Sequence, residues 1–478
     1  MTLRPLAALA IALTVPMPAA ADSSVSERSF SGTQTSRSDV VRRWNAIAVD
    51  ASGLDHTPVT PGETRTAGEQ LGPGRASRAM AIVHIAMFDA ANAIVGRYES
   101  YGDVGRAPRG TSVDAAVAQA AHDTLVAMFP SQQATFDAAL FRELIRVWDR
   151  RARRDGIAVG RRAAEVILAA RADDGARHAE PRVGIEYVTG TQPGDWRQDP
   201  ISRHPLAVGA FWGSVRPFSM EASSQFRVPP PPPMTSFAYA IAFDEVKRLG
   251  GDGVVTRTQR TPDQTHAGIY WAYDGTPSLC APPRLYNQLT LTVAERMGTT
   301  SILETARLLA LVNTAMADAG IAIWESKFFY DVWRPIGGIR EASTDGNPRT
   351  VGDPAFSPLG APASNLTGPN FTPPFPSYPS GHAGFGGAVF QVLRRFYRTD
   401  AIRFTFVSDE YNGKTVGNDG RVRPLEPRTF RSLSQAEEEN GQSRIYLGIH
   451  WAFDKSEGIA QGRRVADWVF DQAFGRRR

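Results

Sequence analysis

The 478-residue sequence lacks several features that would define its class. It has one cysteine, Cys280, which excludes an intramolecular disulfide and any metal cluster held by several thiolates. Its 53 basic and 49 acidic residues give a formal charge of +4, too small an excess to indicate a nucleic-acid-binding surface. No stretch approaches about 18 uninterrupted apolar residues, so we expect no membrane-spanning helix.

Alternating apolar and polar residues, the pattern of a half-buried strand, do not extend beyond a few positions. Apolar residues recur instead at helical spacing from about residue 76, so the predicted fold class is all-α. Five prolines at 229–233 are expected to form a stiff connection between two helical halves, 71–235 and 236–478. The alternative reading of this tract is a proline-motif ligand for a partner domain.

The first residues have the pattern of a secretory signal peptide. Arg4 precedes an apolar stretch from Leu6 to Val15, and small residues suitable for cleavage follow at Ala19–Ala21. This pattern predicts a signal peptide over 1–21 and an exported protein, periplasmic or secreted. The apolar stretch is short for a bilayer span, and an N-terminal anchor is the alternative reading.

Two further segments contain turn-rich sequence. Residues 22–70 are rich in Ser, Thr, Gly and Asp, and we expect an irregular extension with one short helix over 39–49. Residues 398–441 are expected to form an insertion in the second half, with a loop over the turn-rich residues 412–427.

The segment PSYPSGHAGFGGAVFQVL, residues 376–393, combines a helix start with two reactive side chains. Pro379 biases its neighbour towards extended backbone, so the helix should begin at or just after Ser380. A helix start has unpaired N–H groups and a positive dipole end, which suit a tetrahedral oxyanion, and His382 adds an acid/base group there. The simpler reading is an ordinary serine N-cap beside a surface histidine.

Two other segments supply cations and a second histidine. Lys327 and Arg334 are seven residues apart, about two helical turns, so we expect both on one face of a helix that Pro335 ends. Asp454 follows His450 by four residues, near enough on a helix to orient its imidazole. The simpler readings are a solvated cationic face and a core histidine satisfied by its aspartate.

The order Lys-x6-Arg-Pro, Pro-Ser-Gly-His and Ser-Arg-x5-His-x3-Asp resembles the signature of the vanadium-dependent haloperoxidases. That family shares its fold with type 2 phosphatidic acid phosphatases and bacterial class A acid phosphatases. The segments FPSYPSGHAGFGGAVFQ, SRIYLGIHWAFD and WAYDG followed by PPRLYNQ are similar to those of fungal vanadium chloroperoxidases. The resemblance is strong over about 270–460, and it implies two four-helix bundles with the oxyanion site in the second.

The resemblance also implies a vanadate cofactor, whose site phosphate can occupy. His450 would bond to vanadium, and His382 would act as acid or base near the opposite apical oxygen. Lys327 would polarise peroxide bound to vanadate, which acts as a Lewis acid while a halide is oxidised to hypohalous acid. The other contacts to the anion would come from Arg334, Ser380, Gly381 and Arg444.

Supporting residues are expected around this set. The spacing suggests that Asp454 holds the second ring nitrogen of the vanadium-binding histidine. The resemblance implies that Asp274 pairs with an active-site arginine such as Arg334; a loop-capping aspartate is the alternative. Trp324 and Phe375 match the halide pocket of fungal chloroperoxidases, where they would form a dry, chloride-competent wall, and their alternative role is as core aromatics.

The sequence therefore predicts a vanadium haloperoxidase that acts on hydrogen peroxide and a halide, with the halide preference and any organic substrate left open. The alternative is an exported acid phosphatase, in which His450 is the nucleophile, forming a phosphohistidine, and His382 protonates the leaving oxygen. The flanks WRP, FPSYPSGHA and LGIHW depart from those of acid phosphatases and favour the haloperoxidase. A binding protein without catalysis has no support, because both histidines are present.

Overall fold

Helices make up most of the fold, as the apolar spacing predicts. The computed structural model describes residues 39–477, and within this range the only strands are β1 (Phe404–Phe406) and β2 (Arg428–Phe430). These strands form a small antiparallel sheet inside the insertion predicted for 398–441. The all-α class is therefore confirmed, whereas the signal peptide predicted for 1–21 lies outside the described residues.

The first half of the described chain is built around one buried helix. Its α-helices are α1 (Val40–Asp55), α2 (Gly72–Val95), α3 (Val113–Met128), α4 (Gln133–Leu144) and α5 (Arg150–Ala170). Helix α2 packs against α3 and α5, and its Ile82 and Phe88 side chains are fully buried. Side chains cap the neighbouring helices: the Ser112 hydroxyl, for example, accepts a hydrogen bond from the Ala115 N–H at the start of α3.

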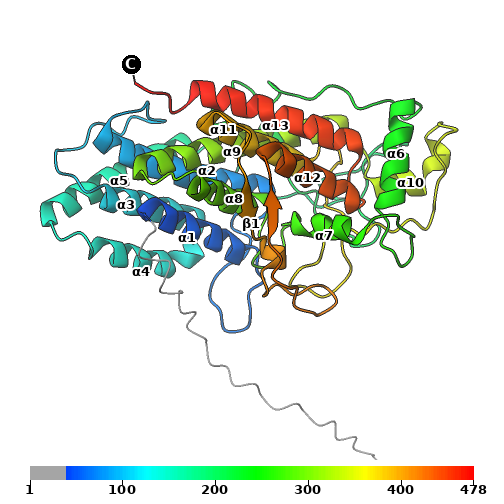
Figure 1. Cartoon of the computed structure of the whole chain (residues 1–478), viewed down its shortest axis with the longest axis horizontal. Coiled ribbons are helices and arrows are strands. Elements are labelled where there is room, and N and C mark those ends of the chain that lie inside the picture. Colours follow the sequence, from blue (N-terminus) through cyan, green and yellow to red (C-terminus); the bar gives the residue numbers. More distant parts are fainter. Residues whose placement is uncertain (1–38, 478) are drawn as a thin grey trace, which may run out of the picture. The chain divides into compact units, whose positions relative to one another are not determined.

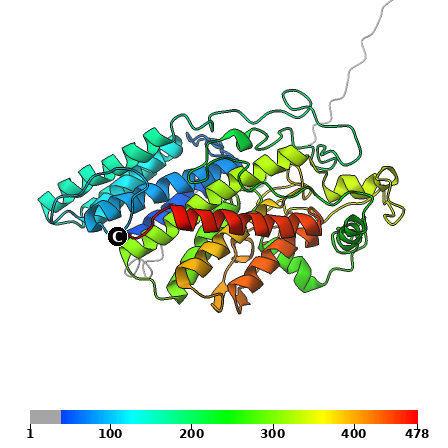
Figure 2. The same cartoon turned by 90° about the horizontal axis from the view of Figure 1, so that it is seen from above.

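The second half carries the predicted motifs and shares a hydrophobic core with the first. Its α-helices are α6 (Phe237–Leu249), α7 (Pro262–Tyr270), α8 (Pro282–Arg296), α9 (Ile302–Tyr330), α10 (Pro335–Arg340), α11 (Gly381–Tyr397), α12 (Leu433–Tyr446) and α13 (Ala452–Gln472). Helix α9 packs against α2 of the first half and against α11 and α13 of the second (Figures 1 and 2). One cluster of buried apolar side chains therefore runs through both halves.

Helix α1 differs from the prediction for residues 22–70. It extends to Asp55, well beyond the short helix expected over 39–49, and Val40, Trp44 and Ala48 on one of its faces are fully buried. Asp39 caps it by accepting a hydrogen bond from the Arg42 N–H. The described part of 22–70 is therefore not entirely irregular, because it contains α1, and α1 belongs to the core.

Within residues 39–477, two helices, α2 and α9, are long and apolar enough to cross a bilayer. In their most apolar 18-residue windows, 89% of α2 and 94% of α9 is buried inside the fold. The same length and composition occur in core helices, and these two helices pack against each other at the centre of the fold.

Candidate active site

The start of α11 lies where the sequence predicts it. Ser380 is the N-cap and its hydroxyl accepts from the Ala383 N–H, while its own N–H donates to the backbone carbonyl of Asp454, 2.9 Å away. Glycines on both helices allow α11 and α13 to approach closely, since a Cβ on Gly387 would overlap the carbonyl of Ile459 and a Cβ on Gly462 would overlap the carbonyl of Gly384. These contacts bring the second and third sequence motifs together.

Lys327 and Arg334 lie close together, as predicted, but they do not lie on one helix. Helix α9 ends at Tyr330, because Asp331 adopts a left-handed conformation (φ 50°), and Arg334 is the N-cap of α10. Pro335 therefore begins a helix and does not end one. The two cations still converge: the Lys327 Nζ and the Arg334 guanidinium lie 5.2 and 5.0 Å from the centroid of the Phe375 ring.

Asp331 itself gives a testable pH dependence. Burial, reinforced by the charge of Asp195, raises the pKa of this carboxyl to about 7. A folded-state pKa above the unfolded value of about 3.9 means that the contribution to stability is present below pH 4 and lost as pH rises through 7. Asp331→Asn, which tolerates the left-handed backbone, should therefore melt about 2–4 °C above the wild type at pH 8. The gain should vanish near pH 4; an equal gain at both pH values would contradict this account.

The arginines present unpaired donors. Arg334 Nε donates to the Phe375 carbonyl and its Nη1 to the Ile449 carbonyl, both at 2.9 Å. Arg444 of α12 donates from Nη2 to Asp274 Oδ1 at 2.7 Å. Among the described residues, Arg334 Nη2 and both Nε and Nη1 of Arg444 are buried with no hydrogen-bond partner. Buried donors on permanent cations require an acceptor, and an anion supplies one.

His450 presents a basic nitrogen beside these cations. Its Nδ1 lies 2.7 Å from Asp454 Oδ2, and its Nε2 lies 2.9 Å from Arg334 Nη1. Since an arginine can only donate, Nε2 is an acceptor, and the ring proton is on Nδ1. Burial and the Arg334 charge lower the pKa of His450 well below its usual value, so the ring is neutral.

The expected Asp454–His450 contact is present, although not within one helix. His450 precedes α13, and Asp454 is the third residue of that helix. The carboxylate also accepts from the Trp451 N–H at 3.0 Å and from the Ser377 hydroxyl. Burial raises the pKa of Asp454 to about 6. The aspartate thus fixes the tautomer of the histidine from a rigid helix start.

Asp274 pairs with an active-site arginine, as the resemblance implies, although the partner is Arg444 and not Arg334. The loop that carries Asp274 lies against α12, so Arg444 is the nearer guanidinium; burial raises the pKa of the Asp274 carboxyl. The same oxygen, Oδ1, is 3.9 Å from Nε2 of His382, which is also hydrogen-bonded to the carbonyl of Ala272. Burial, followed by the Arg444 charge, lowers the pKa of His382 well below its usual value.

Trp324 and Phe375 form an aromatic wall next to Lys327. Their ring centroids are 5.0 Å apart, and Lys327 Nζ lies 5.8 Å from the Trp324 ring. Trp324 is fixed by a hydrogen bond from its Nε1 to the Val208 carbonyl at 3.0 Å. A Cβ on Gly381 would lie 3.3 Å from the Trp324 ring, so this wall touches the first turn of α11. The halide-pocket role remains a prediction.

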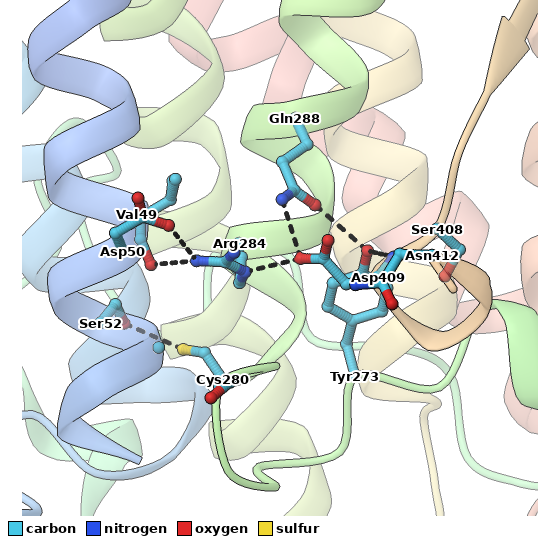
Figure 3. Close-up of polar contacts among 12 residues, drawn as sticks. Val49, Asp50, Ser52, Tyr273, Cys280, Arg284, Gln288, Ser408, Asp409 and Asn412 are labelled. Atoms are coloured by element: carbon cyan, nitrogen blue, oxygen red, sulfur yellow. Dashed lines mark hydrogen bonds and ion pairs between the residues drawn. The ribbon is translucent and has the colours of Figure 1, made fainter. Parts of the chain in front are cut away.

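The Asp274 loop rests on a polar network that the sequence analysis did not identify (Figure 3). Arg284 of α8 donates to the Val49 carbonyl of α1 at 2.6 Å and to Asp409 at 2.8 Å. The backbone N–H of Asp409 donates to the Tyr273 hydroxyl at 2.6 Å. The partners are more than one hundred positions apart, so local patterns do not indicate the network. The only signal was PPRLYNQ after WAYDG, because it contains Arg284.

Removing one atom tests this support. Tyr273→Phe leaves the Asp409 N–H without its acceptor and Gln288 without a hydroxyl donor at 3.1 Å. Since Tyr273 is fully buried, we expect a loss of about 1–3 kcal/mol in the free energy of unfolding, measured by urea titration. Tyr446→Phe, at a half-buried hydroxyl, is the matched control and should change stability by less. Equal losses in the two variants would argue against the network.

The sequence is similar to one protein-family model and to one characterised relative. Residues 307–476 match the family model described as the VCPO second helical-bundle domain. The vanadium chloroperoxidase of Curvularia inaequalis is 34% identical over 332 residues, which cover 58% of this chain and 54% of that protein. The match thus spans about half the length of this relative.

Solved structures share the fold over most of the chain. The first bacterial vanadium-dependent iodoperoxidase superposes with a TM-score of 0.70 and 22% identity, covering 91% of this chain and 97% of the other. A holo-type bacterial vanadium-dependent chloroperoxidase superposes with a TM-score of 0.62 and 17% identity, covering 89% and 97%. The solved structures show a shared fold, and the family model and the 34% identical relative show that the half of the chain carrying the site is similar to the vanadium chloroperoxidases.

Proposed function

We propose that this protein is a vanadate-dependent haloperoxidase that uses hydrogen peroxide to oxidise a halide to hypohalous acid. The observation that carries the proposal is the set of buried, unpaired N–H groups on Arg334 and Arg444 beside the unprotonated Nε2 of His450, whose hydrogen-bond partner is Arg334 Nη1. An oxyanion bound to the histidine would accept hydrogen bonds from these N–H groups and would take Nε2 as its ligand.

The chemistry of the site fits vanadate. Three cations, Lys327, Arg334 and Arg444, outnumber the two carboxylates, Asp274 and Asp454, and burial lowers the pKa of Lys327 and Arg334. Burying these cations costs free energy, and a bound anion would offset that cost by pairing with the excess positive charge. Among residues 39–477, no group of three or more His, Cys, Asp or Glu side chains could hold a bare metal ion. The residues therefore favour an oxyanion over a metal cation.

Each residue that would hold vanadate would make a different contact with it. His450 Nε2 would provide the bond to vanadium, and the arginines would bind oxygens of the anion with their unpaired N–H groups. The Ser380 hydroxyl and the Gly381 N–H, at the helix start, would donate as well. Bound vanadate supplies Lewis-acid activation of peroxide without changing its own oxidation state.

Lys327 and His382 are suited to moving and holding protons. Lys327 Nζ donates to the carbonyls of Pro376 and Ser377 at 2.7 and 2.9 Å, which leaves its third N–H for a substrate oxygen. The hydrogen bond to the Ala272 carbonyl places the ring proton of His382 on Nε2 and leaves Nδ1 as the basic atom. The lowered pKa of His382 keeps that atom unprotonated and ready to accept a proton.

Two finer assignments belong to this proposal. The wall formed by Trp324 and Phe375 supports chloride as a substrate, because an apolar aromatic surface removes water from a weakly bound anion. The signal-peptide pattern over 1–21 supports export to the periplasm or the medium.

The test is a pair of assays on purified protein stripped of bound anions. One measures halogenation of monochlorodimedone with hydrogen peroxide and chloride, bromide or iodide, with and without orthovanadate. The other measures hydrolysis of p-nitrophenyl phosphate. We expect halogenation only with orthovanadate; phosphate-ester hydrolysis that orthovanadate inhibits, without halogenation, would assign the protein to the phosphatases.

A further inference from the structure

An apolar stripe faces solvent at the end of α4. Phe141, Ile145 and Trp148 are 66%, 52% and 92% exposed. Phe141 and Ile145, four residues apart, lie on one side of the helix end, where the Ile145 N–H donates to the Phe141 carbonyl, and Trp148 follows in the connection to α5. The opposite side already packs in the core through Phe136 and Ala139. This stripe therefore has no partner within the described part of the chain.

Arginines surround the stripe. Residues 141–155 contain six arginines and three acidic residues, a net charge of +3 (6 − 3). The arginines are Arg142, Arg146, Arg150, Arg151, Arg153 and Arg154. The acidic side chains have structural roles: Glu143 is buried against Arg43, and Asp149 caps α5 by accepting from the Ala152 N–H. Asp155 pairs with both Arg151 and Arg154, at 3.7 and 3.3 Å, yet these arginine side chains remain 76% and 75% exposed.

The location of this surface leaves the active site accessible. In Figures 1 and 2 the connection between α4 and α5 lies at the left end of the fold, whereas α6 and α10 lie at the right. Helix α10 begins directly after the site residue Arg334. A partner bound to the left end would not cover the start of α10.

We propose that the surface formed by residues 141–155 docks the protein on an anionic lipid bilayer. Exposed tryptophan and phenylalanine beside arginines match what the membrane interface accepts, with rings at the level of the headgroups and guanidinium groups on lipid phosphates. A second copy of the chain fits poorly, because a two-fold contact would bring two positively charged surfaces together. Nucleic acid would use the arginines but would leave the aliphatic Ile145 without a role.

The first measurement is vesicle cosedimentation at low salt. Wild-type protein should bind vesicles of phosphatidylglycerol and phosphatidylcholine at least about tenfold more tightly than vesicles of phosphatidylcholine alone. Binding should weaken as sodium chloride is raised to about 0.5 M, because salt screens the attraction. Equal binding to both kinds of vesicle, or binding to neither, would overturn the proposal.

Variants separate the charge from the apolar contribution. Arg150→Glu with Arg154→Glu, and separately Trp148→Ala, should each reduce vesicle binding at least about tenfold. The matched controls are Arg257→Glu with Arg421→Glu and Val254→Ala, all at exposed positions elsewhere, and they should bind as the wild type does. Unchanged melting temperatures and halogenation rates would show that all variants are folded. Controls that lose binding as strongly as the test variants would show a non-specific charge effect and overturn the assignment.

Tryptophan fluorescence tests whether Trp148 enters the bilayer, and duplex DNA tests whether the surface binds nucleic acid and not lipid. The difference between the wild type and Trp148→Phe isolates the emission of Trp148, which should shift to shorter wavelength on anionic vesicles and be quenched by lipids labelled in the acyl chain. An unshifted difference spectrum would exclude insertion. If duplex DNA binds and vesicles do not, with the same loss in the arginine variants, the surface belongs to nucleic acid.

Discussion

His450→Ala should abolish vanadate-dependent halide oxidation, with a loss in kcat/KM of at least about 10³-fold, or about 4 kcal/mol. The reason is that His450 places an unprotonated Nε2 among the cations of the site, while the Asp454 carboxylate fixes its Nδ1 at 2.7 Å. Without the imidazole, the cations can still attract an anion but cannot hold it at a defined atom. Orthovanadate should therefore bind weakly and stay exchangeable, as measured by equilibrium dialysis.

The variant should remain folded, which separates this prediction from simple loss of structure. Asp454 keeps hydrogen bonds from the Trp451 N–H and the Ser377 hydroxyl, so its carboxylate is not left unpaired. His266→Gln, at a half-buried histidine outside the site, is the control and should keep full activity. Retention of more than a tenth of the wild-type rate in His450→Ala would exclude a vanadium bond at this position.

The parts of the site that the sequence predicted are those set by short-range rules. A proline, a serine N-cap and a helical run of apolar residues are contiguous, so the start of α11 at Gly381 follows from local propensity. The all-α class follows in the same way from apolar periodicity. The four-residue spacing of His450 and Asp454 also predicted a real contact, although a helix start and not a helix interior creates it.

The parts that the sequence analysis missed depend on tertiary structure. The end of α9 is set by Asp331 in a left-handed conformation, which local propensity favours for glycine and does not signal for an aspartate. The partner of Asp274 is decided by how its loop meets α12, a contact between residues 170 positions apart. Helix α1 continues through Asp50, Ser52 and Gly53, which are weak helix formers, so its packing on the core explains its length.

Replacing Arg444 should lower both the stability of the protein and its affinity for orthovanadate, because Arg444 neutralises Asp274 and also has N–H groups available for the anion. Arg444→Met removes the guanidinium that donates to Asp274 Oδ1 at 2.7 Å and leaves the carboxylate buried without its cation. We expect the free energy of unfolding to fall by about 3–5 kcal/mol at pH 8 in the absence of vanadate. Orthovanadate affinity should fall about 10²-fold or more, because two charge-assisted hydrogen bonds to the anion are lost as well.

Adding Asp274→Asn to Arg444→Met separates these two effects. The double variant no longer buries an unpaired carboxylate, so most of the lost stability should return, whereas orthovanadate affinity should stay low. Arg421→Met, at an exposed position, is the matched control and should change neither quantity. If the double variant is no more stable than Arg444→Met, the cost comes from lost packing around the arginine stem and not from Asp274. If it recovers both stability and affinity, Arg444 acts only by neutralising Asp274, and the anion is held by Arg334, Lys327 and His450 alone.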